Sequence, residues 1–170
     1  LGVVFLVFLV LSYVENTSFF VYIQDSFKNP VLAVPLVFIH NVLAISLIIL
    51  AMAFYVGIVM TFMPKRKMEY VIVDNPEIFA IVFTIVIILI SVLRASMLVH
   101  GEVDLNTLAL VILLSLPNGL VEGYGIFQAI KKTLKKTLAM RDLTVIYAIF
   151  FIAAIVEVGF VQALLWLSAK

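Results

Sequence analysis

The longest stretch without a charged residue decides the fold: Val31–Met63, VLAVPLVFIHNVLAISLIILAMAFYVGIVMTFM. A straight helix of these 33 residues would be about 50 Å long, whereas the hydrocarbon core of a bilayer is about 30 Å thick. The helix could tilt strongly, but we favour a break near Pro35, with an interfacial turn before His40 and a membrane span over about residues 39–63. The sequence Pro64-Lys65-Arg66-Lys67 ends that span abruptly.

The rest of the chain repeats this pattern of apolar runs between charges. Asn75-Pro76 followed by Glu77 is favourable chemistry for a helix N-terminus, and the runs do not alternate apolar and polar residues as barrel strands do. The sequence therefore predicts an all-α, polytopic membrane protein with about five transmembrane helices. Residues 1–170 form a single transmembrane helical domain, and its short first helix suggests that the numbered chain begins inside that helix. The further spans are Leu1–Val14 and about 77–99, 105–130 and 143–168.

The composition agrees with lipid as the solvent. Hydrophobic residues make up 65% of the chain and charged residues 12%, whereas a soluble domain has about 45–50% and about 25%. These values exclude a soluble globular domain, a disordered tail and a nucleic-acid-binding module. Because the chain has no cysteine, disulfides, thiolate metal sites and cysteine nucleophiles are excluded as well.

Basic residues gather in alternate loops. Loops 64–76 and 131–142 carry 3 and 5 Lys or Arg residues, and the intervening polar loops carry one lysine. Since basic loops stay in the cytoplasm, we predict a multipass protein of the cell membrane with loops 64–76 and 131–142 cytoplasmic. The stretch Lys131–Arg141 is expected to hold anionic lipid headgroups, and the alternative is a docking surface for a cytoplasmic partner.

Apart from Glu77 at a helix start, three charged residues fall inside the predicted spans, where a charge is costly. Arg94 either reaches the outer headgroups or pairs within the membrane. Glu157 lies at a matching depth for that pair, whereas Glu122 lies nearer the cytoplasmic end. Glu122 and Glu157 are therefore paired, protonated or exposed to water, and we expect Glu157 to face the bundle interior near Arg94 or near Pro117.

The sequence Pro117-Asn118-Gly119 interrupts the fourth predicted span. Proline removes one backbone hydrogen bond and clashes with the preceding turn, so we predict that the helix bends or unwinds between Ser115 and Gly119. In transporters such breaks mark binding sites, and the alternative is a simple kink. Gly119-x-x-x-Gly123, with Gly125, also predicts close packing against another helix.

No enzyme motif appears in the chain. It has no nucleophile elbow, phosphate loop or zincin helix, and its aspartates lie in loops or at a helix end, which excludes an intramembrane aspartyl protease. His40-Asn41 is interpreted as an interfacial polar pair, since His40 and His100 lack metal-ligand spacing. We therefore predict no catalytic, cofactor-binding or metal site.

Several motifs together resemble a known family. Pro117-Asn118-Gly119-Leu120-Val121-Glu122 is similar to the Pro-His-Gly-x-x-Glu signature of the stage II sporulation protein M family, with small residues after it. The segment Ala153–Phe160 resembles that family's late Ala-Ala-x-x-Glu segment, and His40-Asn41 with Gly57 resembles its early helix. The resemblance covers about residues 38–162, and Asn118 stands where the family usually has histidine.

In spore-forming bacteria the namesake of this family is a multipass subunit that helps to hold peptidoglycan-degrading partners at the septum and is not itself the hydrolase, so the resemblance implies a multipass subunit that acts through partners. The first hypothesis is accordingly a non-enzymatic membrane scaffold whose partners are membrane lipids, other membrane or envelope proteins, or a second copy of itself, and no nucleic acid. The second is a small-solute or ion transporter or channel that uses the broken helix with Glu122 and Glu157. An intramembrane enzyme is the least favoured reading.

Overall fold

The computed structural model describes Ser26 and residues 29–62, 67–100 and 105–168, without the side chains of residues 67–70, 92–100, 105–111, 114 and 163–168. The described elements are all α-helices, so the all-α prediction is confirmed for this part of the chain. The predicted first span, Leu1–Val14, lies outside the described residues. The helices are α2 (Pro30–Phe62), α3 (Lys67–Asp74), α4 (Pro76–His100), α5 (Leu105–Leu134) and α6 (Met140–Ser168).

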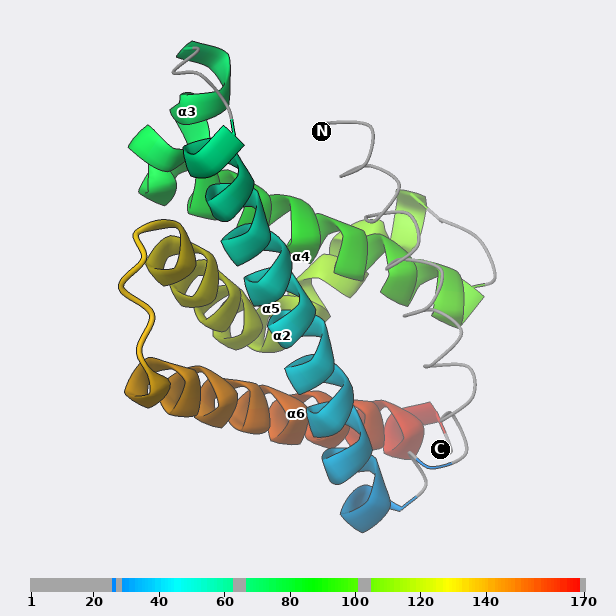
Figure 1. Ribbon diagram of the computed structural model, residues 1–170. Coiled ribbons are helices and arrows are strands. Elements are labelled where there is room, and N and C mark those ends of the chain that lie inside the picture. The colour runs from blue at the N-terminus through cyan, green and yellow to red at the C-terminus, as the bar shows by residue number, and fades with distance from the viewer. Residues whose placement is uncertain (1–25, 27–28, 63–66, 101–104, 169–170) are drawn as a thin grey trace.

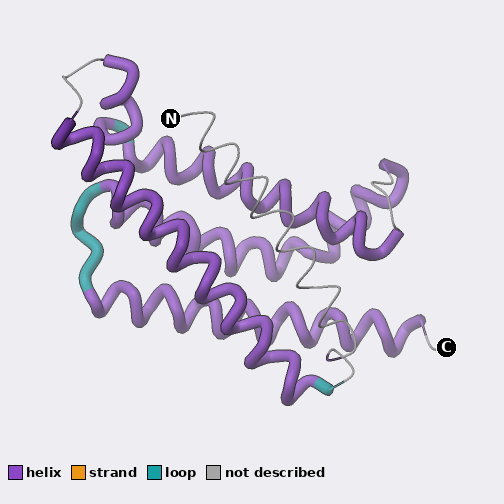
Figure 2. Tube along the Cα trace, turned by 45° about the vertical axis from the view of Figure 1, so that its right-hand side comes forward, coloured by secondary structure: helices purple, strands orange, loops and turns teal. Residues whose placement is uncertain are grey.

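Helix α5 lies at the centre of the bundle. It packs against α4, α6 and α2, and α2 also packs against α6 (Figures 1 and 2). The end of α2, the start of α4, the end of α5 and the start of α6 gather at one end of the bundle, together with α3 (Figure 1). We call this the basic end, because the lysines of residues 131–136 lie there. Helix α3 and the lysines of residues 131–136 therefore lie at the same end of the bundle, as the span order predicts.

The apolar core divides into two clusters. The larger one draws on all four long helices, and the smaller one joins α2 to α6 alone. Helix α4 consequently packs mainly through one face, where Ala80, Phe83 and Thr84 are buried. The larger cluster is Ile45, Met52, Val56, Ala80, Phe83, Ile126, Ala129, Ile130, Leu134, Ile146 and Phe150, and the smaller is Ala33, Val37, Ala154 and Val158.

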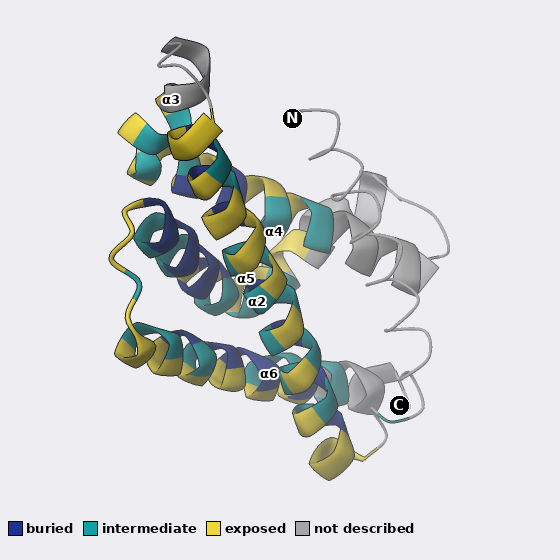
Figure 3. Cartoon of the chain, in the orientation of Figure 1, coloured by how far each residue is buried: buried dark blue, intermediate teal, exposed yellow. Residues whose placement is uncertain are grey.

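Exposed residues lie along the outer faces of the helices (Figure 3), and many of them are large apolar side chains. Along α2 they form an exposed stripe of Leu43, Leu47, Leu50 and Phe54. Among the described residues, two helices are long and apolar enough to cross a membrane, Pro30–Phe62 and Met140–Gln162, and their most apolar windows are only 22% and 28% buried. A core helix of a soluble protein would be mostly buried, so burial within the described part of the chain does not account for the apolar character of these two helices.

The predicted break near Pro35 is wrong, because α2 is one helix from Pro30 to Phe62. The N-terminus of α2 and the contacts beside Pro35 explain why the helix is continuous. The Asn29 side chain accepts a hydrogen bond from the Val31 N–H at 3.1 Å, and Pro30 occupies the first helical position, where its missing N–H costs nothing. Pro35 removes a single further donor, and the buried contacts of Ala33 and Val37 on either side hold the helix together.

Of the two outcomes predicted at Pro117, a bend or an unwinding, the structure shows the bend. Helix α5 remains helical throughout, with Pro117 inside it, although its two halves run in different directions (Figure 1). One missing hydrogen bond can bend a helix without ending it, especially where the following turn packs closely on a neighbour. The sequence motif therefore marks a continuous proline-containing helix.

The basic segments are more helical than expected. Helix α3 occupies residues that we expected to form a loop, and α5 continues to Leu134 instead of ending near residue 130. Thr133 donates to the carbonyl of Ala129 at 2.7 Å, and the Lys131 ammonium lies 5.3 Å from the centre of the Phe127 ring. Such local contacts allow charged residues to extend a helix beyond its apolar part.

The turn after α5 ends in a residue of left-handed conformation. Lys136 has a φ of 55°, its N–H donates to the Thr133 carbonyl, and the Thr137 N–H donates to the Lys132 carbonyl, both at 3.0 Å. This pair of bonds is a Schellman motif, in which glycine is the usual left-handed residue. A lysine side chain makes that conformation strained.

Replacing Lys136 with glycine should therefore stabilise the fold. We expect Lys136→Gly to raise the free energy of unfolding by roughly 0.5–1 kcal/mol, since relief of the strain exceeds the added flexibility of the unfolded chain. Thermal unfolding in detergent measures the change. Lys136→Ala removes the same charge but keeps the left-handed strain, so it should not stabilise. Equal effects of the two substitutions would contradict the strain argument.

Candidate functional site

Glycines bring α5 into close contact with its neighbours on two sides. A Cβ added at Gly123 would lie 2.6 Å from Ile88 Cδ1, and one added at Gly119 would lie 3.7 Å from Ile88 Cγ2. On the side of α6, a Cβ added at Gly125 would lie 3.0 Å from Phe150 Cε2. The expected close packing is confirmed, and it is divided between α4 and α6.

Three contacts between helices fix the depth of the polar residues. Gly123 lies against Thr84, Gly125 lies against Phe150, and the Ser46 and Tyr147 hydroxyls are 2.9 Å apart. From these contacts, the depth of any other residue along the bundle follows from the rise of about 1.5 Å per residue. By this measure, one or more polar residues of each of the four long helices lie within roughly two helical turns of one another in depth. We call this set the central polar layer: Asn41, Thr84, Asn118, Glu122 and Glu157.

Three atoms of the central polar layer are buried without a hydrogen-bond partner in the described structure: Asn41 Nδ2, Thr84 Oγ1 and Asn118 Oδ1. Asn41 and Thr84 are each only 7% exposed. An unsatisfied buried polar group costs about 1–3 kcal/mol, so each such atom in a folded protein calls for a structural or functional explanation. They come from α2, α4 and α5, and each is a position where water or a polar solute could bind.

The two acidic members of the central polar layer are half-buried. Glu157 follows buried Ala153 by one turn and adjoins buried Val158, whereas Glu122 adjoins Gly123. The Arg94 side chain lies outside the described side chains, so its pairing with Glu157 stays a prediction. The residues that the structure describes contain no group of three His, Cys, Asp or Glu side chains that could hold a metal ion.

His40-Asn41 lies deeper than the sequence indicated. The interfacial placement depended on a break near Pro35, and in the continuous helix Asn41 lies about 16 Å from the start of α2. Asn41 is buried on the same face as Val37 and Ile45, and His40 is half-buried. Asn41 is therefore an interior residue of the bundle.

An ion-pair cluster at the basic end was missed from the sequence. The Glu77 carboxylate lies in the first turn of α4 and forms ion pairs with two lysines. Its Oε1 atom is 2.7 Å from Lys135 Nζ and 2.9 Å from Lys131 Nζ. The spacing of four residues between the two lysines puts them on one face of α5, a signal that could have indicated a shared partner. The cluster ties the start of α4 to the end of α5.

A second ion pair closes the turn between α5 and α6. Lys132 Nζ lies 2.6 Å from Asp142 Oδ1, and Asp142 Oδ2 accepts the Ala139 N–H at 2.9 Å. The latter bond is half of a capping box, because Asp142 is the third residue of α6 and Ala139 immediately precedes the helix. Asp142 thus joins α5 to α6 and also caps α6.

The two lysines change the acidity of Glu77. Hydrogen bonds from Lys135 and then Lys131, with their positive charges, lower the pKa of this exposed carboxyl from 4.5 to about 2. A lowered pKa in the folded protein stabilises the fold above the unfolded pKa, and that stabilisation is lost as the pH falls toward the folded pKa. The pH window is therefore about 4.5 down to about 2.

Close packing at Gly123 predicts a specific clash. Gly123→Ala should lower the free energy of unfolding by roughly 1 kcal/mol, because its Cβ would lie 2.6 Å from Ile88 Cδ1 and the end of the Ile88 side chain would have to move. Ile88→Val removes that methyl group and should restore part of the loss in the double variant. Gly159→Ala is the matched control, since no atom lies within 4 Å of its Cβ position. Thermal unfolding of the variants checks this, and additive effects of Gly123→Ala and Ile88→Val would contradict the contact.

The Glu77 ion pairs predict an acid-sensitive part of the stability. In detergent, the wild-type chain should lose more stability than Glu77→Gln as the pH falls from about 4.5 to about 2. Other carboxylates titrate in both proteins, so the difference between the two melting curves isolates Glu77. Lys135→Gln should lose less stability than the wild-type chain over the same pH range, because it removes one of the two ion pairs of Glu77. Parallel pH profiles for wild type and Glu77→Gln would show that the ion pairs do not contribute.

No family model matches this chain, and no curated protein or solved structure matches it either.

Proposed function

We propose that this chain is a non-enzymatic integral membrane protein that serves as a scaffold or subunit of a membrane complex, as in the stage II sporulation protein M family. The observation that carries the proposal is the close packing of α5 at Gly123 and Gly125. The two turns that follow the Pro117-Asn118-Gly119 motif contact Ile88 of α4 through Gly123 and Phe150 of α6 through Gly125. A passage beside α5 at this depth would require these side chains to move.

The outer surface supports a membrane location. Leu47 is 64% exposed and Phe54 is 69% exposed on α2, and exposed apolar residues also lie on α4, α5 and α6. In water, a monomeric protein rarely keeps so much contiguous apolar surface exposed, whereas lipid or a membrane partner covers it at no cost. The ion pairs between Glu77 and the lysines of α5 bring the two basic segments to one end, which supports a cytoplasmic location for both.

The motifs quoted above support the family resemblance. In this proposal Pro117, Gly119 and Glu122 shape α5, and the partners are membrane lipids with other membrane or envelope proteins or a second copy of the chain. The scaffold acts through its outer faces, while the interior contacts keep those faces in a fixed arrangement.

A transporter is the second candidate, and one observation favours it. Asn41, Thr84 and Asn118 each bury a polar atom without a partner in the described structure, and they lie close in depth to Glu122 and Glu157. Polar groups inside a membrane bundle often line pathways for ions or protons. In this reading the central polar layer is the solute site.

Membrane insertion is tested by cysteine labelling. Met140 is 80% exposed at the basic end and Val31 is 79% exposed near the start of α2. In sealed cells, an impermeant maleimide should label Val31→Cys, and Met140→Cys should react only after the membrane is opened. Thr133, although in a basic loop by sequence, is 6% exposed and unsuitable as a label site. Labelling of both cysteines from one side would overturn the topology.

Purified protein in liposomes separates the scaffold from the transporter. The scaffold predicts proton, Na⁺ and K⁺ fluxes equal to those of protein-free vesicles. The transporter predicts a flux that Glu122→Gln or Glu157→Gln abolishes while the helical content is unchanged, and this result would replace the scaffold proposal.

In native membranes, the scaffold predicts capture of a membrane or envelope protein of defined mass by a photo-cross-linking residue at exposed Leu47. The same residue at Val37, which is 0% exposed, is the matched control and should capture nothing. Capture of lipid alone at exposed positions on every helix would contradict the scaffold.

A further inference from the structure

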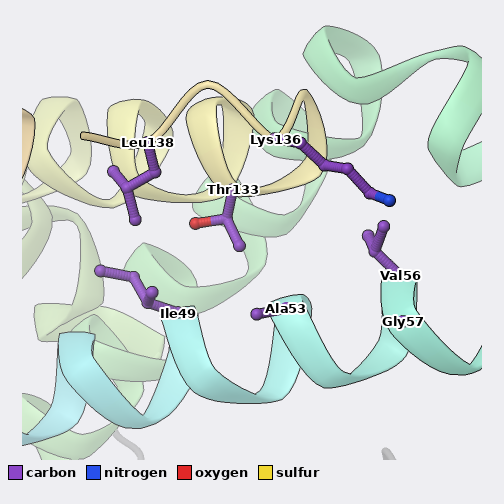
Figure 4. A pocket seen from close by; sticks show the side chains of 7 residues that line it. All are labelled: Ile49, Ala53, Val56, Gly57, Thr133, Lys136 and Leu138. Carbon is purple, nitrogen blue, oxygen red and sulfur yellow. The ribbon is translucent and has the colours of Figure 1, made fainter.

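A groove lies between α2 and the turn that joins α5 to α6 (Figure 4). Its volume is about 380 Å³, and it is open to the outside of the bundle. Small residues of α2 form its floor, because Ala53 and Gly57 are exposed and no atom lies within 4 Å of the Cβ position of Gly57. The lining residues are Ile49, Ala53, Val56, Gly57, Thr133, Lys136 and Leu138.

The groove is apolar along its length and positive at its rim. Ile49, Ala53 and Leu138 project into it from opposite sides, while the Lys136 side chain extends across from the turn and ends near Val56 (Figure 4). Thr133 also lines the wall, but its hydroxyl already donates to the Ala129 carbonyl at 2.7 Å. The ammonium of Lys136 is therefore the charged group that a molecule in the groove would meet.

Lys136 differs from the neighbouring lysines of α5. Lys131 and Lys135 pair with Glu77, and Lys132 pairs with Asp142. Within the described part of the chain, Lys136 has no carboxylate partner. The Schellman turn holds its backbone by two hydrogen bonds in a left-handed conformation, so the base of the side chain stays beside the groove.

We propose that this groove binds one anionic phospholipid, with its phosphate on Lys136 Nζ and an acyl chain along Ile49, Ala53 and Leu138. The inference rests on the proposed membrane location. Charge complementarity identifies the occupant. The groove is apolar, and one side of it carries the Lys136 ammonium, which has no carboxylate partner in the described part of the chain. It lies at the end of the bundle assigned to the cytoplasm, so it matches a molecule with an apolar tail and an anionic head. Basic pockets between helices on the cytoplasmic side of membranes bind anionic headgroups in this way.

The test measures lipid binding to the full chain in neutral detergent. Native mass spectrometry and thermal unfolding are followed as phosphatidylglycerol or phosphatidylcholine is added. We expect retention of one phosphatidylglycerol molecule and a raised Tm, with little effect of phosphatidylcholine. Lys136→Gln should weaken phosphatidylglycerol binding about fivefold, which corresponds to the loss of one lysine near a phosphate. Gly57→Leu should weaken it as well, by filling the floor of the groove without changing any charge.

Arg141→Gln is the matched control, because it removes one charge from the same connector without lining the groove. It should leave phosphatidylglycerol binding within about twofold of wild type. Equal losses for Lys136→Gln and Arg141→Gln would overturn the site in favour of general charge attraction. Unchanged binding in Gly57→Leu would also overturn it, since the acyl chain would then lie elsewhere.

Two further outcomes separate other occupants and the membrane proposal. If inorganic phosphate or glycerol phosphate reproduces the Tm shift, the site binds a free anion, and the lipid proposal fails. If a cross-linker at Ala53 captures a protein in native membranes and phosphatidylglycerol has no effect, the groove is a protein site. If Val31→Cys and Met140→Cys are labelled from opposite sides as expected but phosphatidylglycerol does not bind, the groove proposal fails and the membrane location stands. If the labelling itself fails to show opposite sides, the membrane location fails.

Discussion

The close approach of α5 to both α4 and α6 is the constraint on which the rest of the structure depends. A Cβ added at Gly123 would lie 2.6 Å from the terminal methyl of Ile88 on α4, and one added at Gly125 would lie 3.0 Å from the Phe150 ring on α6, so either side chain would have to shift. In a lipid environment, helix association depends on van der Waals contact more than on expulsion of water, and small residues that let backbones approach are then the effective means of packing. The larger apolar cluster forms around this contact and adds side chains of α2.

The same contact explains why Pro117 bends α5 without ending it. A proline inside a helix removes one hydrogen bond, and the helix survives if the following turn is held in place. Gly119 and Gly123 hold that turn against α4. The packing that stabilises the helix also makes a transport path beside it less favourable, because a solute would have to displace side chains that fill the interface. Within the described part of the chain, the feature that points toward a solute is the set of unpartnered buried atoms on Asn41, Thr84 and Asn118.

The basic end has a different physical character from the apolar bundle. Glu77 and Asp142 each sit in the first turn of a helix, where acidic side chains are favoured, and each pairs with lysines at the end of α5. These pairs are exposed, so their individual contributions to stability are small, but they fix which helix ends lie together. They also account for three of the lysines that the sequence assigned to lipid headgroups, which leaves Lys136 as the lysine beside the α2 groove.

The sequence by itself determined the helical class, the apolar surface and most of the helix boundaries. Charges and helix-starting residues such as Asn75-Pro76 act locally, so their effect can be read without knowing the neighbours. The spacing of Gly119, Gly123 and Gly125 likewise predicted close packing. Tertiary structure decided the rest. Whether Pro35 and Pro117 break a helix depends on the contacts of the flanking turns, and the pairing of Glu77 with lysines of α5 joins residues more than fifty positions apart. Asn41 entered the interior because α2 is continuous. These outcomes depend on which helices lie together, and no local pattern in the chain specifies that.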